Sequence, residues 1–381
     1  MSDGVRIIAP GEPLPPMKDA TVVDTLDQLR ELRDLASEHK ERDIAPSTRR
    51  YYDRDWEGFV RWCNRMNVAP LPVDPEIVGL YITDLARTVT LDGEPAVKVS
   101  TLRRYVASLS RINYENGGGR GLGEHPEVTR VLGGLSRQRQ EAHSPRAPLL
   151  RDDVARIIDA MDHSSWPAGV TSARDTLAFL LGFASALRRE NVAALTVDDL
   201  VVNRQDGLHL HIGRSKTDQE GHGALLAIPF GQHPVTCAPC AWHRWASLMA
   251  ATSQAERMRL VLNTPAETSD WQHVCRDTFP QLPPETPVIS RVTKGGNIRL
   301  QSVTGNALYE RIKVRLEGAG YDPTQYGYHS LRAGFVTQAL MNGADARQVR
   351  KQTLHKTDRM VDHYDRDYLP LRGNAVTKIG L

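Results

Sequence analysis

The chain has 381 residues, which is long enough for two domains that each bury a core. Its four cysteines are too few for a disulfide scaffold, so a reducing cytoplasm is the expected location. No apolar run is long enough to cross a bilayer, and the N-terminal residues lack the pattern of a secretory signal.

The formal net charge is only +2, but the charged residues are unevenly distributed. Residues 1–44 contain 6 Lys and Arg against 10 Asp and Glu, whereas residues 291–356 contain 11 against 4. A local basic excess is typical of a segment that neutralises phosphate. The sequence therefore favours an anionic partner at the later segment, where three basic residues are candidates for contact with it: Lys294, Arg311 and Lys313.

Residues 1–44 are predicted to form an arm and one helix. Residues 1–17 are rich in Pro and Gly and should be extended. Apolar side chains then recur at helical spacing, at Val22, Leu26, Leu29, Leu32 and Leu35. We expect this stripe to pack on its own domain, with binding to a partner as the alternative. Its acidic surroundings speak against contact with a phosphate backbone.

Residues 45–140 are predicted to form four helices. Apolar stripes such as Phe59 with Cys63, and Leu102 with Leu109, should face inward. Arginines occupy the outward positions of the same helices. An ordinary solvated face is the alternative for each of them, and the candidates for DNA contact are Arg49, Arg50, Arg54, Arg103 and Arg104.

Residues 141–149 contain two prolines and are predicted to be an extended linker to a second domain, residues 150–368. The apolar stretch before Arg188 predicts a central core helix that would hold this arginine in place. Alternation between 206 and 230 then predicts two strands, with Lys216 near the tip of their hairpin. A surface arginine and an ordinary turn lysine are the alternatives for these two residues.

The segment Cys-Ala-Pro-Cys-Ala-Trp-His begins at Cys237 and contains a Cys-x-x-Cys pair, Cys237 and Cys240, followed by His243. A zinc site would need a fourth ligand, for which His233 is the candidate, and the spacing is more crowded than in usual zinc sites. We therefore favour an ordinary helix start near Pro239, and we expect no metal site.

The segment between Tyr328 and Tyr364 concentrates polar groups suited to phosphate. His329 and Arg332 are three residues apart in a stretch with helical periodicity, so their side chains should share one face. A second predicted helix ends near His355. Taken singly, a His-x-x-R pair is usually a solvated face and a tyrosine near a C-terminus is usually a core-edge aromatic.

Together, these residues resemble the pattern of the tyrosine recombinase family, also called phage integrases. The family's first-arginine segment, hairpin lysine, H-x-x-R box, second histidine and nucleophilic tyrosine have counterparts here in the same order. The resemblance assigns catalytic roles to Arg188, Lys216, His329, Arg332, His355 and Tyr364. One departure is Asn191, which stands where the family usually has an acid, while Glu190 lies one place earlier.

The resemblance implies a mainly α fold with a small β-sheet or hairpin. A four-helix, SAM-like core-binding domain would precede a mixed α+β catalytic domain and a tail at residues 369–381. The implied function is site-specific DNA recombination without metal, ATP or another cofactor, by a nucleoid-associated protein of the cytoplasm. The implied partners are double-stranded recombination sites, further copies of the chain in a tetramer, and accessory DNA-bending or directionality proteins.

The chemistry explains why these residue types are needed. Arg188 and Arg332 would hold the nonbridging phosphate oxygens, because a guanidinium is permanently charged and forked. Lys216 is the candidate general acid for the leaving 5′ oxygen, and the two histidines would orient the phosphate or carry the tyrosine proton. Tyr364 would attack phosphorus and form a 3′-phosphotyrosine. A type IB topoisomerase, a telomere resolvase, an inactive DNA-binding relative and a metal-dependent nuclease remain as alternatives.

Overall fold

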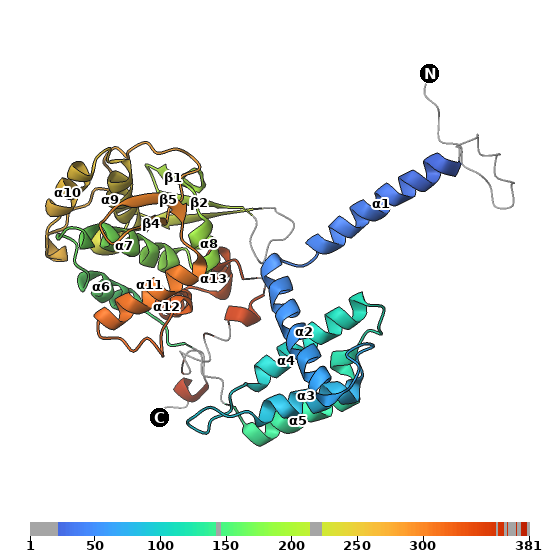
Figure 1. Cartoon of the computed structure of the whole chain (residues 1–381). Coiled ribbons are helices and arrows are strands. Elements are labelled where there is room, and N and C mark those ends of the chain that lie inside the picture. Colours follow the sequence, from blue (N-terminus) through green and yellow to red (C-terminus); the bar gives the residue numbers. More distant parts are fainter. Residues whose placement is uncertain are drawn as a thin grey trace. The chain divides into compact units, whose positions relative to one another are not determined.

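The computed structural model describes residues 22–141, 146–213, 223–355, 357–361, 364, 371 and 375–378. The chain forms two compact units, Met1–His143 and Ser144–Leu381. Helices dominate both units, and within the described ranges the strands form two small antiparallel sheets of the second unit (Figure 1). The predicted fold class, mainly α with a small β component, is therefore confirmed. No helix in the described ranges is both long and apolar enough to cross a membrane.

The first unit is built from helices. They are α1 (Val22–Arg42), α2 (Pro46–Met66), α3 (Pro75–Arg87), α4 (Val99–Glu115), the short η1 (Leu122–Glu124) and α5 (Pro126–Arg139). The core lies between α2, α3, α4 and α5, where Phe59 of α2 packs edge-on against Tyr81 of α3 at a ring distance of 5.2 Å. The predicted inward stripes are confirmed, since Phe59, Cys63, Leu102 and Leu109 are fully buried.

Helix α1 departs from the expectation for its apolar stripe. Leu29, Leu32 and Leu35 are 56%, 61% and 44% exposed, so the prediction that this stripe packs on its own domain was wrong. The periodicity correctly predicted a helix, but amphipathic spacing alone does not state what covers the apolar face.

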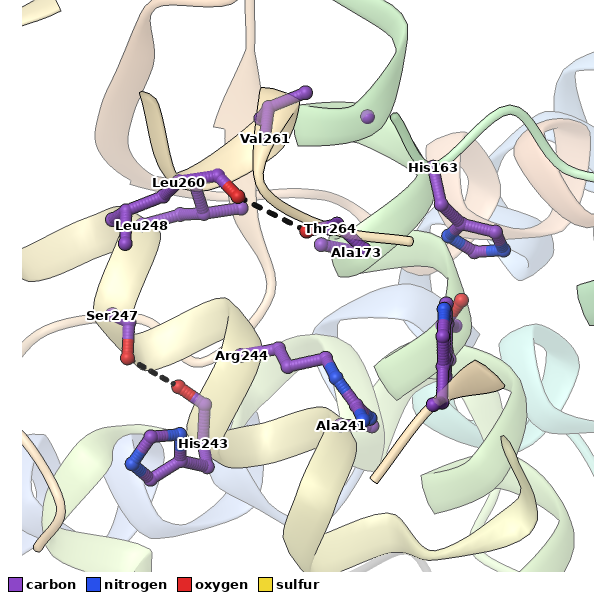
Figure 2. Close-up of a pocket in the computed structure, with 13 residues that line it drawn as sticks. His163, Ala173, Ala241, His243, Arg244, Ser247, Leu248, Leu260, Val261 and Thr264 are labelled. Carbon is purple, nitrogen blue, oxygen red and sulfur yellow. Dashed lines mark hydrogen bonds between the residues drawn. The ribbon is translucent and has the colours of Figure 1, made fainter. Parts of the chain in front are cut away.

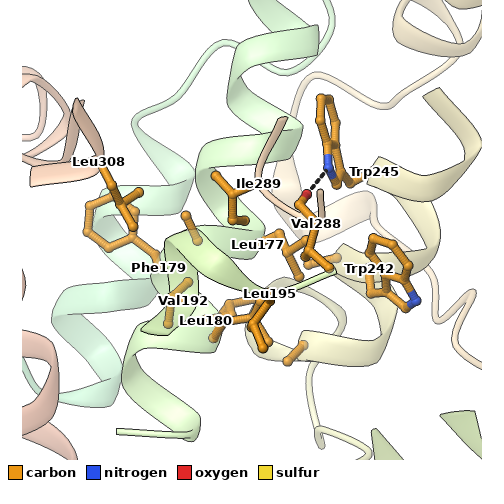
Figure 3. Close-up of a cluster of buried hydrophobic side chains, with 14 of the residues drawn as sticks. Leu177, Phe179, Leu180, Val192, Leu195, Trp242, Trp245, Val288, Ile289 and Leu308 are labelled. Atoms are coloured by element: carbon orange, nitrogen blue, oxygen red, sulfur yellow. Dashed lines mark hydrogen bonds between the residues drawn. The ribbon is translucent and has the colours of Figure 1, made fainter. Parts of the chain in front are cut away.

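The second unit surrounds one long apolar helix, α7 (Ala168–Ala184). Its other helices are α6 (Arg151–Asp159), α8 (Arg189–Ala194), α9 (Ala238–Ala250), α10 (Gln254–Leu262), α11 (Gly305–Gly318), α12 (Tyr328–Met341) and α13 (Ala346–Thr353), with short turns η2 (Val197–Asp199), η3 (Pro234–Thr236), η4 (Thr268–Asp270) and η5 (Ala375–Lys378). Figure 3 shows Leu177, Phe179 and Leu180 of α7 within the buried cluster. Trp245 of α9 closes this core and donates a 2.7 Å hydrogen bond to the Val288 carbonyl.

Two sheets flank these helices. Strands β1 (Leu200–Asn203), β2 (Gly207–Ile212) and β3 (Ala224–Pro229) form an antiparallel sheet in sequence order, and β4 (Ser290–Val292) pairs with β5 (Ile298–Ser302). Leu208 is opposite Ile228 and Leu210 is opposite Leu226, so the predicted pairing of the two strands on either side of Lys216 is confirmed. Lys216 itself lies outside the described residues.

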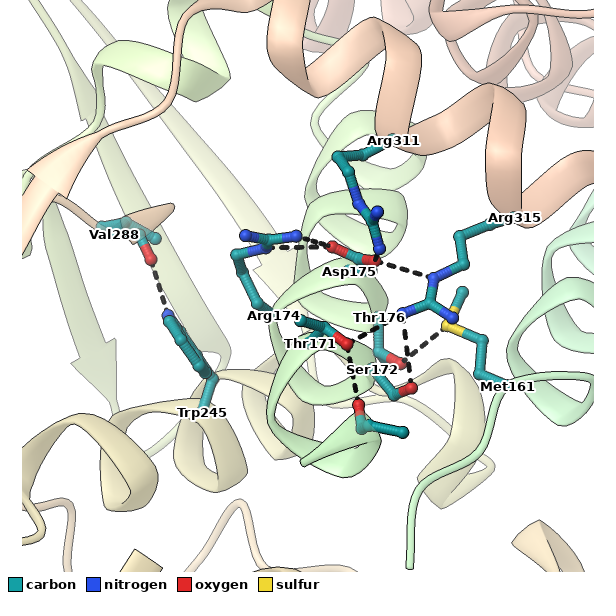
Figure 4. Close-up of polar contacts among 11 residues, drawn as sticks. Met161, Thr171, Ser172, Arg174, Asp175, Thr176, Trp245, Val288, Arg311 and Arg315 are labelled. Carbon is teal, nitrogen blue, oxygen red and sulfur yellow. Dashed lines mark hydrogen bonds and ion pairs between the residues drawn. The ribbon is translucent and has the colours of Figure 1, made fainter. Parts of the chain in front are cut away.

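A buried ion-pair network joins α7 to α11 (Figure 4). Arg174 donates to Asp175 at 2.9 and 2.6 Å, and Arg315 donates to the other carboxylate oxygen at 2.7 Å. Arg311 lies 3.4 Å from the same oxygen. Burial alone would raise the pKa of Asp175, but the three guanidiniums lower it, so the carboxylate stays charged. This network positions α11 against the central helix.

We expect Asp175→Asn to lower the free energy of unfolding by about 3 kcal/mol, because it leaves three arginines around a neutral group. Asp152→Asn is the matched control, since Asp152 pairs with Arg151 at the surface and its side chain is 77% exposed. That change should cost about 0–1 kcal/mol. Equal losses in chemical denaturation would show that the network does not hold α11.

Candidate phosphate-handling site

The site is built where the end of α7 meets the start of α12. Gly182 of α7 lies so close to α12 that a Cβ there would be 2.8 Å from a Leu331 side-chain carbon and 2.9 Å from the Tyr328 hydroxyl. On the next turn of α12, a Cβ at Gly334 would overlap the Leu149 carbonyl oxygen. Close backbone approach at both glycines therefore fixes the first turns of α12, which carry His329 and Arg332.

Arg332 is the most constrained side chain of the site. It is 3% exposed and donates a hydrogen bond to the carbonyl of Ala186, which adopts a left-handed backbone conformation with φ of 51°. Because Arg188 follows two residues later, this hydrogen bond brings the Arg332 guanidinium close to the segment that carries Arg188. Burial, and then the charge of Arg188, lowers the pKa of Arg332 to about 10. It therefore remains charged at neutral pH.

One terminal nitrogen of Arg332, Nη2, is buried and makes no hydrogen bond of regular geometry among the described residues, although the guanidinium also interacts with the Tyr364 hydroxyl. A buried cation with an unpaired donor is costly unless an anion completes it. A cavity of about 340 Å³ lies at this point and is lined by Leu187, Arg188, Arg189, Glu190, Tyr309, Tyr328, His329 and Arg332. The arrangement suits one phosphate group between the two guanidiniums.

The two histidines are held neutral. Burial, followed by the charges of Arg332 and Arg188, lowers the pKa of His355 to about 3 and also lowers the pKa of His329. The Thr353 hydroxyl donates to the Val349 carbonyl and lies 2.9 Å from Nδ1 of His355. It can therefore accept a hydrogen bond from Nδ1–H, which would leave Nε2 as the acceptor nitrogen of the neutral ring.

Tyr364 lies against both histidines. Its hydroxyl is 3.2 Å from Nε2 of His329, and its ring stacks on His355 with a centroid distance of 6.0 Å. Burial raises the pKa of Tyr364, while the charges of Arg332 and Arg188 act in the opposite direction. A neutral His329 can accept the hydroxyl proton, and the nearby cations can stabilise the resulting phenolate.

Five of the six predicted catalytic residues are described, and the structure gathers Arg188, His329, Arg332, His355 and Tyr364 in one place. The residues that orient them were not predicted. Thr353 and Ala186 act through a hydroxyl and a backbone carbonyl, and Gln352 ties α13 to the Ala184 carbonyl at 2.9 Å. Positions of this kind carry no distinctive sequence pattern. Glu190, the acid that lies one place earlier than in the family pattern, accepts a 2.8 Å hydrogen bond from Nε of Arg189.

The candidate DNA-contact residues fall into two groups. Some are already engaged: Arg49 pairs with Glu115 at 2.7 Å, Arg104 pairs with buried Asp55, and Arg311 belongs to the Asp175 network. Lys313 also belongs to this group, since its Nζ lies 5.5 Å from the centre of the Tyr309 ring.

The second group consists of the four exposed candidates, Arg50, Arg54, Arg103 and Lys294. Arg54 and Arg104 also lie over the exposed ring of Tyr51, at 5.2 and 5.7 Å.

A separate cavity of about 180 Å³ lies between α7, α9 and α10 (Figure 2). His163, Arg244 and Trp271 are among its lining residues, and none of the candidate catalytic residues lines it. Its walls are mainly side chains of the core helices. It is therefore distinct from the cavity at the two arginines.

Known proteins resemble this chain in sequence and fold. The sequence profile of the phage integrase family matches residues 148–369. An integrase/recombinase XerD homolog from Selenomonas ruminantium is 26% identical over 346 residues, which cover 90% of this chain and 88% of that protein. Tyrosine recombinase XerD from Listeria monocytogenes is 24% identical over 83% of this chain and 86% of its own length. A crystal structure of a lambda integrase dimer bound to a COC′ core site matches with a TM-score of 0.51 and 15% identity, covering 91% of this chain and 96% of that one.

The neutral histidines generate a prediction about acid stability. A histidine in the unfolded chain titrates near pH 6.5, whereas the pKa of buried His355 is about 3. Between these values the unfolded chain binds more protons, so stability rises with pH and is lost on acidification through the range below about 6.5. His355→Gln should therefore reduce the slope of unfolding free energy against pH by as much as about 1.4 kcal/mol per pH unit.

The control for this measurement is His211→Gln, because His211 is exposed on β2. It should leave the slope as in the wild type. Denaturant unfolding of the DNA-free protein between pH 4.5 and 7.5, which is roughly the range over which the difference should build up, provides the comparison. A wild-type slope in His355→Gln would show that this ring is not held neutral by the fold.

Proposed function

Because the chain belongs to the phage integrase family, we propose that it is a site-specific DNA recombinase that cuts and rejoins strands through a covalent bond to Tyr364. The observation that carries the mechanism is the position of the Tyr364 hydroxyl, 3.2 Å from a neutral His329 and within the field of Arg332 and Arg188. This arrangement supports the proposal, because it would bring together a nucleophile, a proton acceptor and two phosphate-binding cations.

In the proposed reaction, the scissile phosphate lies between Arg188 and Arg332. The Tyr364 oxygen attacks phosphorus as its proton passes to His329, and the bond from phosphorus to the 5′ oxygen breaks. The 5′ oxygen takes a proton from a general acid, for which Lys216 is the candidate, although it lies outside the described residues. The products are a 3′-phosphotyrosine and a free 5′ hydroxyl.

Rejoining reverses these steps with a 5′ hydroxyl from another strand. The phosphotyrosyl ester conserves the bond energy, so the strand transfer needs no ATP. The two guanidiniums stabilise the additional negative charge of the five-coordinate phosphorus, as donors in an oxyanion hole do. No cofactor takes part in the proposed chemistry. Each of the two transfers forms one phosphorus–oxygen bond and breaks another.

The DNA partner follows from the family, and its contacts are part of the proposal. Residues 45–140 would act as the core-binding domain and residues 150–368 as the catalytic domain. Exposed Arg50, Arg54 and Arg103 are the better candidates for phosphate contact in the first domain, because Arg49 and Arg104 are already paired. Lys294, in the exposed turn between β4 and β5, is the corresponding candidate in the second.

The proposed working assembly is a homotetramer on two paired DNA sites, with residues 369–381 of one copy docking on a neighbour. Most of this tail lies outside the described residues. Accessory DNA-bending or directionality proteins would set the direction of the reaction, which can be integration, excision, resolution or inversion. The protein would act in the cytoplasm at the nucleoid, where its DNA sites are.

The central test uses a duplex from the flanks of the chain's own gene, nicked close to the cleavage site. Cleavage then releases the short strand that carries the 5′ hydroxyl, and this strand diffuses away, so religation cannot occur. After denaturation, the wild type should give a covalent protein–DNA band in buffer without added Mg²⁺ or Mn²⁺. Tyr364→Phe should give none while it still binds the duplex, because it lacks the attacking oxygen.

Tyr321→Phe is a control that removes a different tyrosine hydroxyl from the same domain, and it should keep the covalent band, because this hydroxyl donates to Asp153 and Tyr321 does not line the cavity at the two arginines. Equal bands from the wild type and Tyr364→Phe would remove Tyr364 from the mechanism. If neither protein formed a band on DNA that both bind specifically, the chain would be a DNA-binding relative without strand-transfer activity. Free cleaved ends that appear only with added metal would indicate a nuclease.

A further inference from the structure

Four metal-binding side chains converge in the second unit, away from the residues of the candidate recombination site. Cys237 and Cys240 lie at the start of α9, and His273 and Cys275 come from the loop that follows η4. One ligand atom from each residue lies within 4.8 Å of the other three. Nδ1 of His273 is 3.3 Å from the Cys240 sulfur and 3.7 Å from the Cys275 sulfur.

These separations match a tetrahedral zinc site. With a Zn–S bond of about 2.3 Å and a Zn–N bond of about 2.1 Å, the edges of the tetrahedron are roughly 3.6 to 3.8 Å. The two nitrogen-to-sulfur distances therefore fall close to those of a loaded site. The upper limit of 4.8 Å for the whole set requires only small side-chain movements to close around an ion.

The surroundings of the four side chains also fit metal ligands. The other ring nitrogen of His273, Nε2, lies 3.4 Å from the Gln232 carbonyl, which would select the tautomer that presents Nδ1 to a metal. The Gly231 amide donates to the Cys237 sulfur at 3.3 Å. A Cβ on Gly231 would be 2.8 Å from the Cys237 Cα, so the amide can approach this closely only because residue 231 is glycine.

The three cysteines of this site are buried together, which differs from the usual packing of a single cysteine in a core. Cys237 and Cys240 are fully buried and Cys275 is 4% exposed, yet the three form a small cluster of their own with Phe230 and Val274. No disulfide joins them. Buried thiols can act simply as small apolar groups, as Cys63 does in the core of the first unit. That explanation accounts for single cysteines and leaves the convergence of three sulfurs on one imidazole nitrogen unexplained.

The loop that supplies half of the ligands explains what a metal would do. Residues 263–289 connect α10 to β4, and their only helical turn is η4. Irregular segments of this length are uncommon inside a compact domain. Trp271 in this loop is buried against His163, and Arg244 of α9 donates to the Gln272 carbonyl at 2.8 Å. A metal held between this loop and the start of α9 would anchor the segment immediately after Trp271.

We propose that Cys237, Cys240, His273 and Cys275 bind one structural zinc ion that fastens the loop 263–289 to the start of α9. Three sulfurs and one imidazole are a ligand set suited to zinc, and four protein ligands leave no open position for a reacting water. The ion would stabilise the fold and take no part in strand transfer. The site is independent of the proposed recombinase chemistry.

The structure also corrects the ligands considered from the sequence. His243 was the histidine nearest to the Cys-x-x-Cys pair, but its Nε2 lies 3.2 Å from the Thr278 carbonyl and its ring packs edge-on against Phe279 at 5.0 Å. His233 is not in the cluster either. The missing ligands, His273 and Cys275, lie more than thirty positions from Cys240, which is why local spacing argued against a metal.

The test is the metal content of the full chain purified without chelator from cells grown with zinc. Elemental analysis should find one zinc per chain. His273→Ala and Cys240→Ser should lose most of it, whereas His243→Ala and Cys63→Ser should keep one zinc per chain. Zinc content at the wild-type level in both His273→Ala and Cys240→Ser would overturn the proposal.

A second measurement on the wild type does not depend on the folding of variants. Protein stripped with a strong chelator should melt at a lower temperature, and one equivalent of Co²⁺ should restore melting and give the intense visible absorption of tetrahedral cobalt bound by thiolates. Absence of bound zinc, together with no Co²⁺ spectrum, would contradict the site. A mass two hydrogens lower, with two cysteines protected from alkylation, would reveal a disulfide in its place and equally overturn it.

Discussion

The buried guanidinium of Arg332 is the constraint on which the candidate site depends. A permanent charge at 3% exposure is costly, and its hydrogen bond to the Ala186 carbonyl satisfies only part of the group. The same hydrogen bond brings it close to Arg188, a second cation that pairs with no carboxylate among the residues that the structure describes. Glycines at 182 and 334 allow the close packing that keeps α12 in this position. The fold therefore maintains a local excess of positive charge that an anionic phosphate would complete.

This positive field also determines the state of the neighbouring groups. It helps to keep His329 and His355 neutral, and it opposes the effect of burial on Tyr364. A neutral imidazole beside a phenol and two guanidiniums is a combination suited to proton transfer followed by attack on phosphorus. Packing thus imposes this electrostatic arrangement, and it is present in the chain without DNA.

The sequence predicted those parts of the fold that local patterns encode. Alternation at Leu208 and Leu210 identified the strands, and helical spacing placed His329 and Arg332 on one helix. Partners distant in sequence were beyond such patterns. The pairing of Arg311 with Asp175 was not predicted because the two residues are 136 positions apart, and His273 was overlooked because it is 33 residues from Cys240. The stripe on α1 illustrates a third limit, since periodicity does not specify the covering surface.

The arginines that were candidates for DNA contact differ in whether the fold already pairs them with a carboxylate. Arg49, Arg104 and Arg311 each have a carboxylate partner within the fold, whereas Arg50, Arg54 and Arg103 are exposed. A count of basic residues therefore overstates the charge available to DNA. Arg332 belongs to neither group, because it is buried and has an unpaired donor nitrogen among the described residues.

The central claim is that Arg332 and Arg188 form the phosphate clamp. Its most direct test is the single-turnover rate of covalent complex formation by Arg332→Lys on the nicked duplex, with DNA affinity measured separately. Lysine keeps the charge but loses the fork and the geometry set by Ala186. The account predicts a rate lower by about 10²–10³, as for loss of a transition-state donor, with little change in affinity. A wild-type rate in this variant would contradict it.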